Sequence, residues 1–317
     1  MHYVAILYER TLQSRSAAPM GITLRGYNPA TWVNSEWLRL PVYALAYGVC
    51  PTFRDIYLER VDGKSRQSTW ERYQGRIIDE LYKLIHSRCQ EYASHTSTGS
   101  FELYDYLVSI QDQMVSEAKN PHRAALEQAV PQPTQQQIQA FDQGLKKIIR
   151  FEAEITSAFI DFEIARIQSA NPNRIFSEYF DFNTDLALRA KNQGFITPAT
   201  PDFVFRHRVV GDIKSGHWQT FFEYTVVAYA LAYEEHTHSD MNYGAILHVQ
   251  LPRNRQVPAH YEADIIYLDD SKRSKFLVMR NRKLEIITNR IDPGKPDNDS
   301  DCAGCSFYSE CWGGANG

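Results

Sequence analysis

Residues 201–214 read PDFVFRHRVVGDIK, two short apolar runs joined by a basic turn. Runs this short and rich in Val and Phe predict two neighbouring strands that form a hairpin around residues 206–208. Side chains alternate along a strand, so Asp212 and Lys214 are expected on the same face. In such a hairpin Asp202, at the start of the first run, would come to lie beside Asp212.

The acids and the lysine of this segment indicate a metal-dependent hydrolytic site. Two carboxylates brought together repel each other, and a bound Mg2+ or Mn2+ would relieve that repulsion. The ion would polarise a phosphate and lower the pKa of its water, while Lys214 would steady the attacking water or the phosphate. A solvated edge strand carries the same Asp-x-Lys letters by chance, so the segment alone leaves both interpretations open.

The apolar pattern changes from helical to strand-like near residue 175. Helical spacing predicts helices at 37–45, 70–89, 101–119 and 135–169, and later at 218–235 and 272–285, the last capped within residues 269–271. Strands are predicted at 175–182, 202–206, 208–213, 243–251 and 262–268. We therefore expect an α/β protein with a helical region at 1–174, a mixed core at 175–290 and a terminal segment at 291–317.

Three of the five cysteines lie close together near the C-terminus, at positions 302, 305 and 311. Such spacing lets one loop turn several sulfurs toward a single point, as a metal centre requires. A disulfide framework fits poorly because the count is odd, no secretory signal is recognised, and a chain of 317 residues is too large to need disulfides. Both Zn2+ and a [4Fe-4S] cluster accept four thiolates. The single short cysteine pair favours the cluster, with zinc as the alternative.

The composition is that of an ordinary globular protein, with 43% hydrophobic and 23% charged residues. The first seven residues are too short and too lightly apolar for a signal sequence or a membrane span, so we expect a cytoplasmic protein with no membrane partner. A net charge of −4 argues against a strongly basic nucleic-acid binder but leaves room for a local basic groove. The candidate DNA contacts are Arg54, Arg60, Lys272, Lys275 and Arg280, although basic side chains on an exposed helix are most often only solvated.

The Asp202–Lys214 segment and the terminal cysteines, together with three further blocks given below, resemble the iron–sulfur RecB-type exonucleases of CRISPR adaptation, the Cas-four and Csa-one type. Asp202 with the run from Asp212 to Lys214 matches the PD-(D/E)xK nuclease signature. Residues 47–58, YGVCPTFRDIYL, are similar to a block of the CRISPR-associated branch. Residues 25–28 and 229–234 add two weaker blocks, and the resemblance extends to the terminal cysteines.

The resemblance implies a restriction-endonuclease-like mixed sheet flanked by helices, with a large helical N-terminal part and a C-terminal iron–sulfur clasp packed against residues 45–60. It implies that Cys50 is the fourth cluster ligand, together with Cys302, Cys305 and Cys311. Cys89 is then left as a buried apolar residue.

The same resemblance implies that Asp202 and Asp212 bind Mg2+ or Mn2+ and that Lys214 is the catalytic lysine. A departure occurs on the first core helix, where such nucleases carry a His-Glu pair and this chain has Asp79 and Glu80. An aspartate can bind Mg2+ but lacks the imidazole that favours Mn2+. Either acid could complete the site, and the preferred ion stays open.

The function implied by the resemblance is a metal-dependent DNA exonuclease that trims single strands or DNA ends before their insertion into a CRISPR array, with the integrase complex as its partner. A repair nuclease of similar construction is one alternative. The chain has no G-x4-G-K-[ST] motif, so any helicase motor would be a separate protein. A catalytically weak DNA-binding or assembly subunit is another alternative, which Asp79 at the expected histidine position favours. Strand polarity and oligomeric state are not specified.

Overall fold

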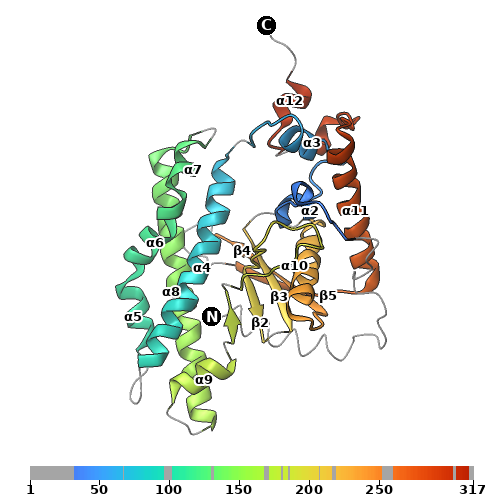
Figure 1. The fold of residues 1–317 in the computed structure, drawn as a ribbon. Helices are drawn as coiled ribbons and strands as arrows, with labels where there is room; N and C mark the ends of the chain where they lie inside the picture. The colour runs from blue at the N-terminus through green and yellow to red at the C-terminus, as the bar shows by residue number, and fades with distance from the viewer. Residues whose placement is uncertain are drawn as a thin grey trace.

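The predicted α/β architecture is confirmed: a five-stranded sheet lies between two groups of helices (Figure 1). The computed structural model describes residues 32–66, 68–95, 102–129, 132–167, 171–179, 181–184, 186–206, 208–215, 219–251, 260–302 and 305–313. Among its helices, none combines the length and apolarity that crossing a membrane requires.

The sheet follows the order of the chain. Its strands are β1 (Phe182–Asn183), β2 (Phe203–Phe205), β3 (Val209–Lys214), β4 (Tyr243–Gln250) and β5 (His260–Tyr267). Among the five strands that the structure describes, β3 and β4 are the pair that runs parallel, and α10 (Phe222–Thr237) makes the crossover that a parallel pair requires. The other neighbouring strands are antiparallel.

The hairpin of β2 and β3 forms as predicted, with Phe203 opposite Gly211. The aromatic ring of Phe203 lies so close to this glycine that an added Cβ would stand 1.9 Å from it. Both residues are buried, so the glycine is what allows the ring to cover the strand.

A helical arm covers one side of the sheet. Its elements are α4 (Trp70–His95), α5 (Leu103–Ser109), α6 (Gln111–Lys119), η3 (Asn120–His122), α7 (Arg123–Glu127), α8 (Gln135–Ile167) and α9 (Pro172–Tyr179). Within this arm, the long α4 lies nearest the sheet (Figure 1). The predicted apolar stripe of α4, which includes Tyr73, Ile77 and Leu81, is buried in a core shared with α8 and with the strands.

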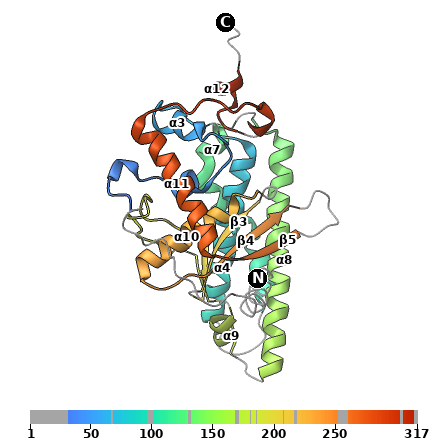
Figure 2. The same ribbon diagram turned by 90° about the vertical axis from the view of Figure 1, so that its right-hand side faces the viewer.

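The opposite side of the sheet brings distant parts of the chain together. It contains η2 (Glu36–Leu38), α2 (Val42–Ala46), α3 (Arg54–Arg60), α10, α11 (Asp270–Asn289), η4 (Asp299–Cys302) and α12 (Tyr308–Trp312). A second buried cluster joins α2, α10, α11 and the sheet, and Asp269 caps α11 as predicted by accepting the N–H of Lys272 at 2.9 Å. In Figure 2, α3 lies beside the upper end of α11 and near α12.

Three predicted elements differ from the structure. The strand predicted at 175–182 is wrong: α9 occupies Pro172–Tyr179, begins with a proline and is capped by Asn171, whose Oδ1 accepts the N–H of Arg174 at 3.1 Å. The helix predicted at 101–119 is divided at Ile110 into α5 and α6. The helix predicted at 37–45 is interrupted before Pro41, a residue that cannot donate a helical hydrogen bond.

Candidate functional site

The β2–β3 hairpin brings Asp202, Asp212 and Lys214 together. Asp202 immediately precedes β2, and its Oδ2 accepts a hydrogen bond from the N–H of Ile213 at 2.6 Å. Asp212 on β3 is 3% exposed, and its Oδ2 lies 2.5 Å from Lys214 Nζ. The pKa of Asp202 is raised to about 6, first by burial and second by the negative charge of Asp212. The acids therefore sit where a second negative charge is unfavourable.

The helix α4 adds a third carboxylate to this group. Gly75 of α4 faces the end of β3, where a Cβ on the glycine would stand 3.1 Å from Ser215 Oγ. One turn later, Asp79 is paired with Lys83 at 2.9 Å. Burial, followed by the charge of Asp202, raises the pKa of Asp79 to about 7. Asp79 therefore belongs to the acid cluster.

Glu80, the other candidate acid of α4, is not among the main causes of the raised pKa of Asp202 or Asp79. Burial lowers the pKa of His122 of η3, and the charges of both Glu80 and Asp79 oppose that effect. By contrast, the charge of Asp202 is the second cause of the raised pKa of Asp79, after burial. The geometry thus favours Asp79 over Glu80 as the third acid.

The carboxylates have the chemistry of a divalent-cation site. Asp79 Oδ1 is buried without a hydrogen-bond partner, and Asp212 Oδ2 faces Lys214 without a hydrogen bond of normal geometry. Oxygen ligands and crowded negative charge suit Mg2+ or Mn2+. As the described side chains stand, no three His, Cys, Asp or Glu residues converge on one point, and lysines neutralise Asp79 and Asp212 instead.

Tyr47 is a site residue that the sequence reasoning did not identify. Its hydroxyl accepts a 3.1 Å hydrogen bond from Lys214 Nζ, and its ring packs against Phe221 at a centroid distance of 5.2 Å. Burial alone would lower the pKa of Lys214, but the charge of Asp212 raises it overall. Lys214 is thus held as an ammonium. Tyr47 is the first residue of the block 47–58, which is most similar to the adaptation nucleases. That similarity is the sequence feature that could have identified Tyr47 as a site residue.

The segment that carries Tyr47 is anchored by a buried lysine of α11. Lys283 is 0% exposed, and its Nζ donates to the carbonyl oxygens of Ala44 at 2.9 Å, Leu45 at 3.0 Å and Tyr47. These carbonyls lie at the C-terminal end of α2, where a helix lacks internal donors and favours a cation.

The cysteine segments of the two ends lie against each other. Thr52 Oγ1 donates to the carbonyl oxygen of Gly294 at 2.8 Å, across 242 positions of chain. Arg54 on α3 forms hydrogen bonds of 2.8 to 3.1 Å with the carboxylate of Asp292. Cys50 and Cys302 are buried, Cys305 and Cys311 are half-buried, and all four carry free thiols.

The sulfurs are surrounded by N–H donors. Cys302 Sγ accepts from Trp312 Nε1, Cys305 Sγ from the Phe307 N–H, and Cys311 Sγ from Arg54, each at 3.4 Å. Such donors stabilise thiolates and tune iron–sulfur clusters. The donor set therefore fits a thiolate-bound metal, although the four thiols do not form a complete ligand set in the described residues. Cys89 is remote from them and fully buried, and burial raises its pKa to about 12.

The predicted DNA contacts divide into accessible and inaccessible residues. Arg280 does not fit its prediction: it is 0% exposed and binds the carbonyl and side chain of Gln193 at 3.2 and 3.1 Å. It is a packing residue, because α11 turns this face toward the core. Lys275 is exposed, Lys272 pairs with Asp269 at 3.2 Å, and Arg60 lies 3.7 Å from Glu59. Arg54 forms an ion pair with Asp292 and a hydrogen bond with Cys311.

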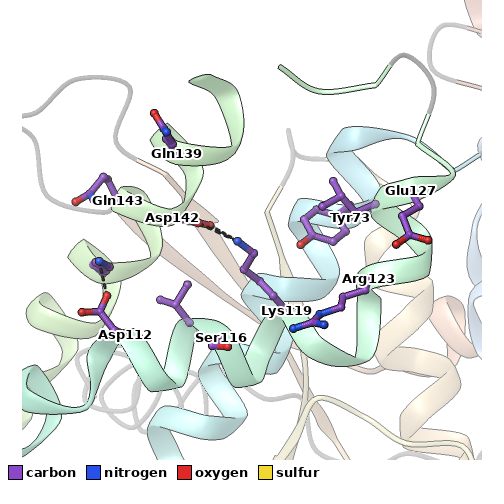
Figure 3. Close-up of a pocket in the computed structure, with 12 residues that line it drawn as sticks. Tyr73, Asp112, Ser116, Lys119, Arg123, Glu127, Gln139, Asp142 and Gln143 are labelled. Carbon is purple, nitrogen blue, oxygen red and sulfur yellow. Dashed lines mark hydrogen bonds and ion pairs between the residues drawn. The ribbon is translucent and has the colours of Figure 1, made fainter. Parts of the chain in front are cut away.

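A cavity of about 580 Å³ lies between α4, α6, α7 and α8, and its lining residues do not include the hairpin acids (Figure 3). Its wall contains the ion pair of Lys119 with Asp142 at 2.8 Å and that of Lys146 with Asp112. Arg123 and Tyr73 also line it. No motif of the sequence pointed to this cavity, because it is formed by helices that meet only in the folded arm.

Comparison with known proteins identifies the family. A sequence model of the family described as CRISPR-associated exonuclease Csa1 matches residues 2–314. The chain belongs to this family. The range includes the acid cluster and all four clustered cysteines, so the Csa1 family match covers both candidate sites.

Two relatives named CRISPR-associated exonuclease Csa1 are similar to the chain at low identity. The protein from Thermoproteus tenax is 22% identical over 97% of both chains. The protein from Saccharolobus solfataricus is 24% identical over 50% of this chain and 52% of its own, so that match spans about half of the relative. A crystal structure of a protein designated SSO0001, 13% identical, superposes with a TM-score of 0.29 over 73% of this chain and 94% of that one, which is too low to support a fold argument.

Proposed function

We propose that this Csa1-family protein is a metal-dependent DNA exonuclease with a restriction-endonuclease-like core of the PD-(D/E)xK type. The observation that carries the proposal is the meeting of Asp79, Asp202, Asp212 and Lys214 at the end of β3. Names of relatives in the family, which include the word exonuclease, agree with it. The wider role proposed is the trimming of DNA fragments for CRISPR spacer acquisition.

The residues of the chain have separate tasks in this proposal. Asp202 and Asp212, assisted by Asp79, would hold a Mg2+ or Mn2+ ion, which when bound lowers the pKa of a water molecule and polarises the scissile phosphate. Lys214, kept protonated by Asp212 and Tyr47, would stabilise negative charge on that phosphate. The burial of Asp212 excludes water that would weaken these interactions.

We further propose a [4Fe-4S] cluster bound by Cys50, Cys302, Cys305 and Cys311, with Zn2+ as the alternative. Its main role would be to clasp the N-terminal and C-terminal segments, as a cross-link does. Closing a loop of roughly 250 residues restricts the unfolded chain, which contributes several kcal/mol in the chain-entropy picture, about 5 kcal/mol for loops beyond 100 residues. The contacts of Arg54 with Asp292 and of Thr52 with Gly294 support this arrangement.

The proposed partners are DNA and the CRISPR integrase complex. A single strand or a DNA end suits an exonuclease whose acids are largely buried, because a free end can bend toward them. The integrase complex follows from the resemblance alone, so it is a proposal to be tested by co-purification.

Degradation of labelled DNA tests the activity. Purified protein with Mg2+ or Mn2+ should shorten linear single strands labelled at either end and leave circular single strands intact. Asp212→Ala and Lys214→Ala should each reduce the rate by at least 100-fold, because each removes a group facing the reacting phosphate. Asp161→Ala and Lys191→Ala, at exposed positions, serve as controls. Unchanged degradation by the Asp212→Ala and Lys214→Ala proteins would disprove the catalytic assignment.

A DNA-binding or assembly subunit with weak activity is a second candidate. The observation favouring it is that lysines neutralise Asp79 and Asp212 and that no three metal-binding side chains of the described residues converge. A wild-type protein that degrades no DNA with either ion, yet binds the integrase, would decide for this candidate.

The identity of the cysteine-bound metal has its own test. A brown protein with broad visible absorbance and stoichiometric iron, both lost on Cys302→Ser, is expected. Cys89→Ser should keep both, since that thiol lies buried in the helical arm. A colourless protein with stoichiometric zinc would show that the cysteines bind Zn2+ and that the cluster proposal is wrong.

A further inference from the structure

One side of α4 carries a line of charged side chains that leads to the acid cluster. Arg72, Arg76, Asp79 and Lys83 follow one another at intervals of four, three and four residues, which places them on one side of a helix. A rise of about 1.5 Å per residue puts the Cα atoms of Arg72 and Arg76 about 6 Å apart along the axis, and those of Arg76 and Asp79 about 4.5 Å.

The members of this line differ in whether they have partners. Arg72 donates to Ser306 of the C-terminal segment, and Lys83 pairs with Asp79. Arg76 is exposed, and no carboxylate of the described residues pairs with it. Arg76 is thus a cation one turn away from Asp79 with its hydrogen bonds free for a ligand.

A second arginine without an ion pair among the described residues lies on α7 of the helical arm. Arg123 begins α7, is exposed, and has no ion-pair partner within the described part of the chain. The arm is held to the start of α4 by Ser68 Oγ, which donates to the carbonyl oxygen of Ala125 at 3.0 Å. Figure 3 shows Arg123 at the wall of the cavity near Lys119.

Positive charge is concentrated between these two elements. Burial lowers the pKa of Arg72, and the charges of Arg66 and Arg76 lower it further. Beside burial, the charge of Arg76 also lowers the pKa of His122, the residue before Arg123. The charges of Glu80 and Asp79 oppose this effect on His122. Like charges held together cost stability unless an anion neutralises them.

We propose that Arg76 and Arg123 bind the phosphates of a single DNA strand beside the one that is cleaved. The proposal rests on the proposed nuclease function and assigns the path of its substrate. A single strand fits because Asp212 is 3% exposed: a flexible strand can bend a phosphate toward it, whereas a stiff duplex cannot. The path differs from the late helix α11, where Arg280 and Lys283 are buried.

Binding measurements test this path in the absence of cleavage. The full chain with Asp212→Asn is combined with Arg76→Gln or Arg123→Gln, and the anisotropy of a labelled 20-nucleotide oligothymidine is measured across salt concentrations. Each arginine variant should raise Kd about fivefold near 0.1 M salt and reduce the slope of log K against log salt by about 0.7, the loss of one single-strand phosphate contact. An unlabelled duplex of equal length should compete poorly.

Arg88→Gln is the matched control because it removes the same charge from the same helix. Arg88 is neutralised by Glu91 at 2.9 Å and Glu117 at 3.0 Å, so its loss should leave Kd and the slope unchanged. If the Arg76 and Arg123 variants keep the Kd and the salt slope of the Asp212→Asn protein, the proposed path is wrong. Duplex binding as tight as single-strand binding would also overturn it. A wild type that degrades no DNA would refute the nuclease function, whereas a lowered slope in the Asp212→Asn background would still support the path.

Discussion

The ammonium of Lys214 donates a 3.1 Å hydrogen bond to the hydroxyl of Tyr47, linking residues 167 positions apart. Tyr47 lies three residues before Cys50, and Lys214 is on the strand that carries Asp212. The hydrogen bond therefore connects the cysteine clasp to the acid cluster. It also predicts that the clasp segment affects the acid cluster through the position of Lys214.

Tyr47→Phe should lower kcat of DNA degradation about five- to tenfold with little change in KM. The variant keeps the packing of the ring on Phe221 but removes the acceptor that orients Lys214. Tyr43→Phe is the control, since Tyr43 is 42% exposed and lies one helical turn earlier. Steady-state kinetics measure the effects on kcat and on KM separately. A change confined to KM would mean that Tyr47 contacts DNA and does not position the lysine.

Arg54→Met should lower the melting temperature and the iron or zinc content together. The arginine joins α3 to Asp292 and to Cys311, and both contacts are partly shielded from water, so a loss of about 1–2 kcal/mol is expected. Arg60→Met, on the same helix but 3.7 Å from Glu59, should change neither quantity. Calorimetry and metal analysis provide the readouts. Full metal content in the Arg54 variant would show that this arginine does not support metal binding by the cysteines.

Glu234→Gln should destabilise the protein by about 3–5 kcal/mol in urea unfolding. Glu234 and Arg273 are each 1% exposed and form two hydrogen bonds of 2.7 and 2.9 Å between α10 and α11. Removing one charge leaves the other buried and unpaired.

The exposed pair of Arg282 and Glu285 on α11 provides the comparison. Glu285→Gln should cost less than about 1 kcal/mol because water screens that pair. Equal losses at the two positions would contradict the burial argument.

Lys283 predicts a rise in stability at alkaline pH. Burial lowers its pKa from 10.5 to about 8, although the charge of Asp55 opposes this. The unfolded chain therefore binds more protons than the folded protein between these values, so the free energy of unfolding increases as pH rises from about 8 to 10.5. The gain is at most roughly 3 kcal/mol, and the three carbonyl acceptors reduce it.

Urea unfolding at several pH values measures this effect as a difference between proteins. The wild type should gain stability relative to Lys283→Met as pH increases through that window, whereas Lys191→Met, at an exposed position, should follow the wild type. A difference that does not depend on pH would show that Lys283 keeps its proton throughout.

Several features could be predicted from the sequence because they depend on neighbours in the chain. The β2–β3 hairpin and the shared face of Asp212 and Lys214 follow from strand alternation. The Asp269 cap and the α4 stripe follow from helical spacing. The strand predicted at 175–182 failed because Ile175 and Phe176 suit a buried helix face as well as a strand, and the cap at Asn171 decided for the helix.

The amino-acid sequence by itself determined the family, the spacing of the cysteines and the local chemistry of the hairpin, since these depend on residue order and on short-range geometry. Only the tertiary structure decided which cations are available. Arg280 and Lys283 look like surface charges in a basic helix, yet packing against α2 and the residue 193 turn buries them. Arg76 is exposed near the acids because α4 lies against the end of β3. Burial and charge pairing depend on elements far apart in the chain, and residue order does not reveal them.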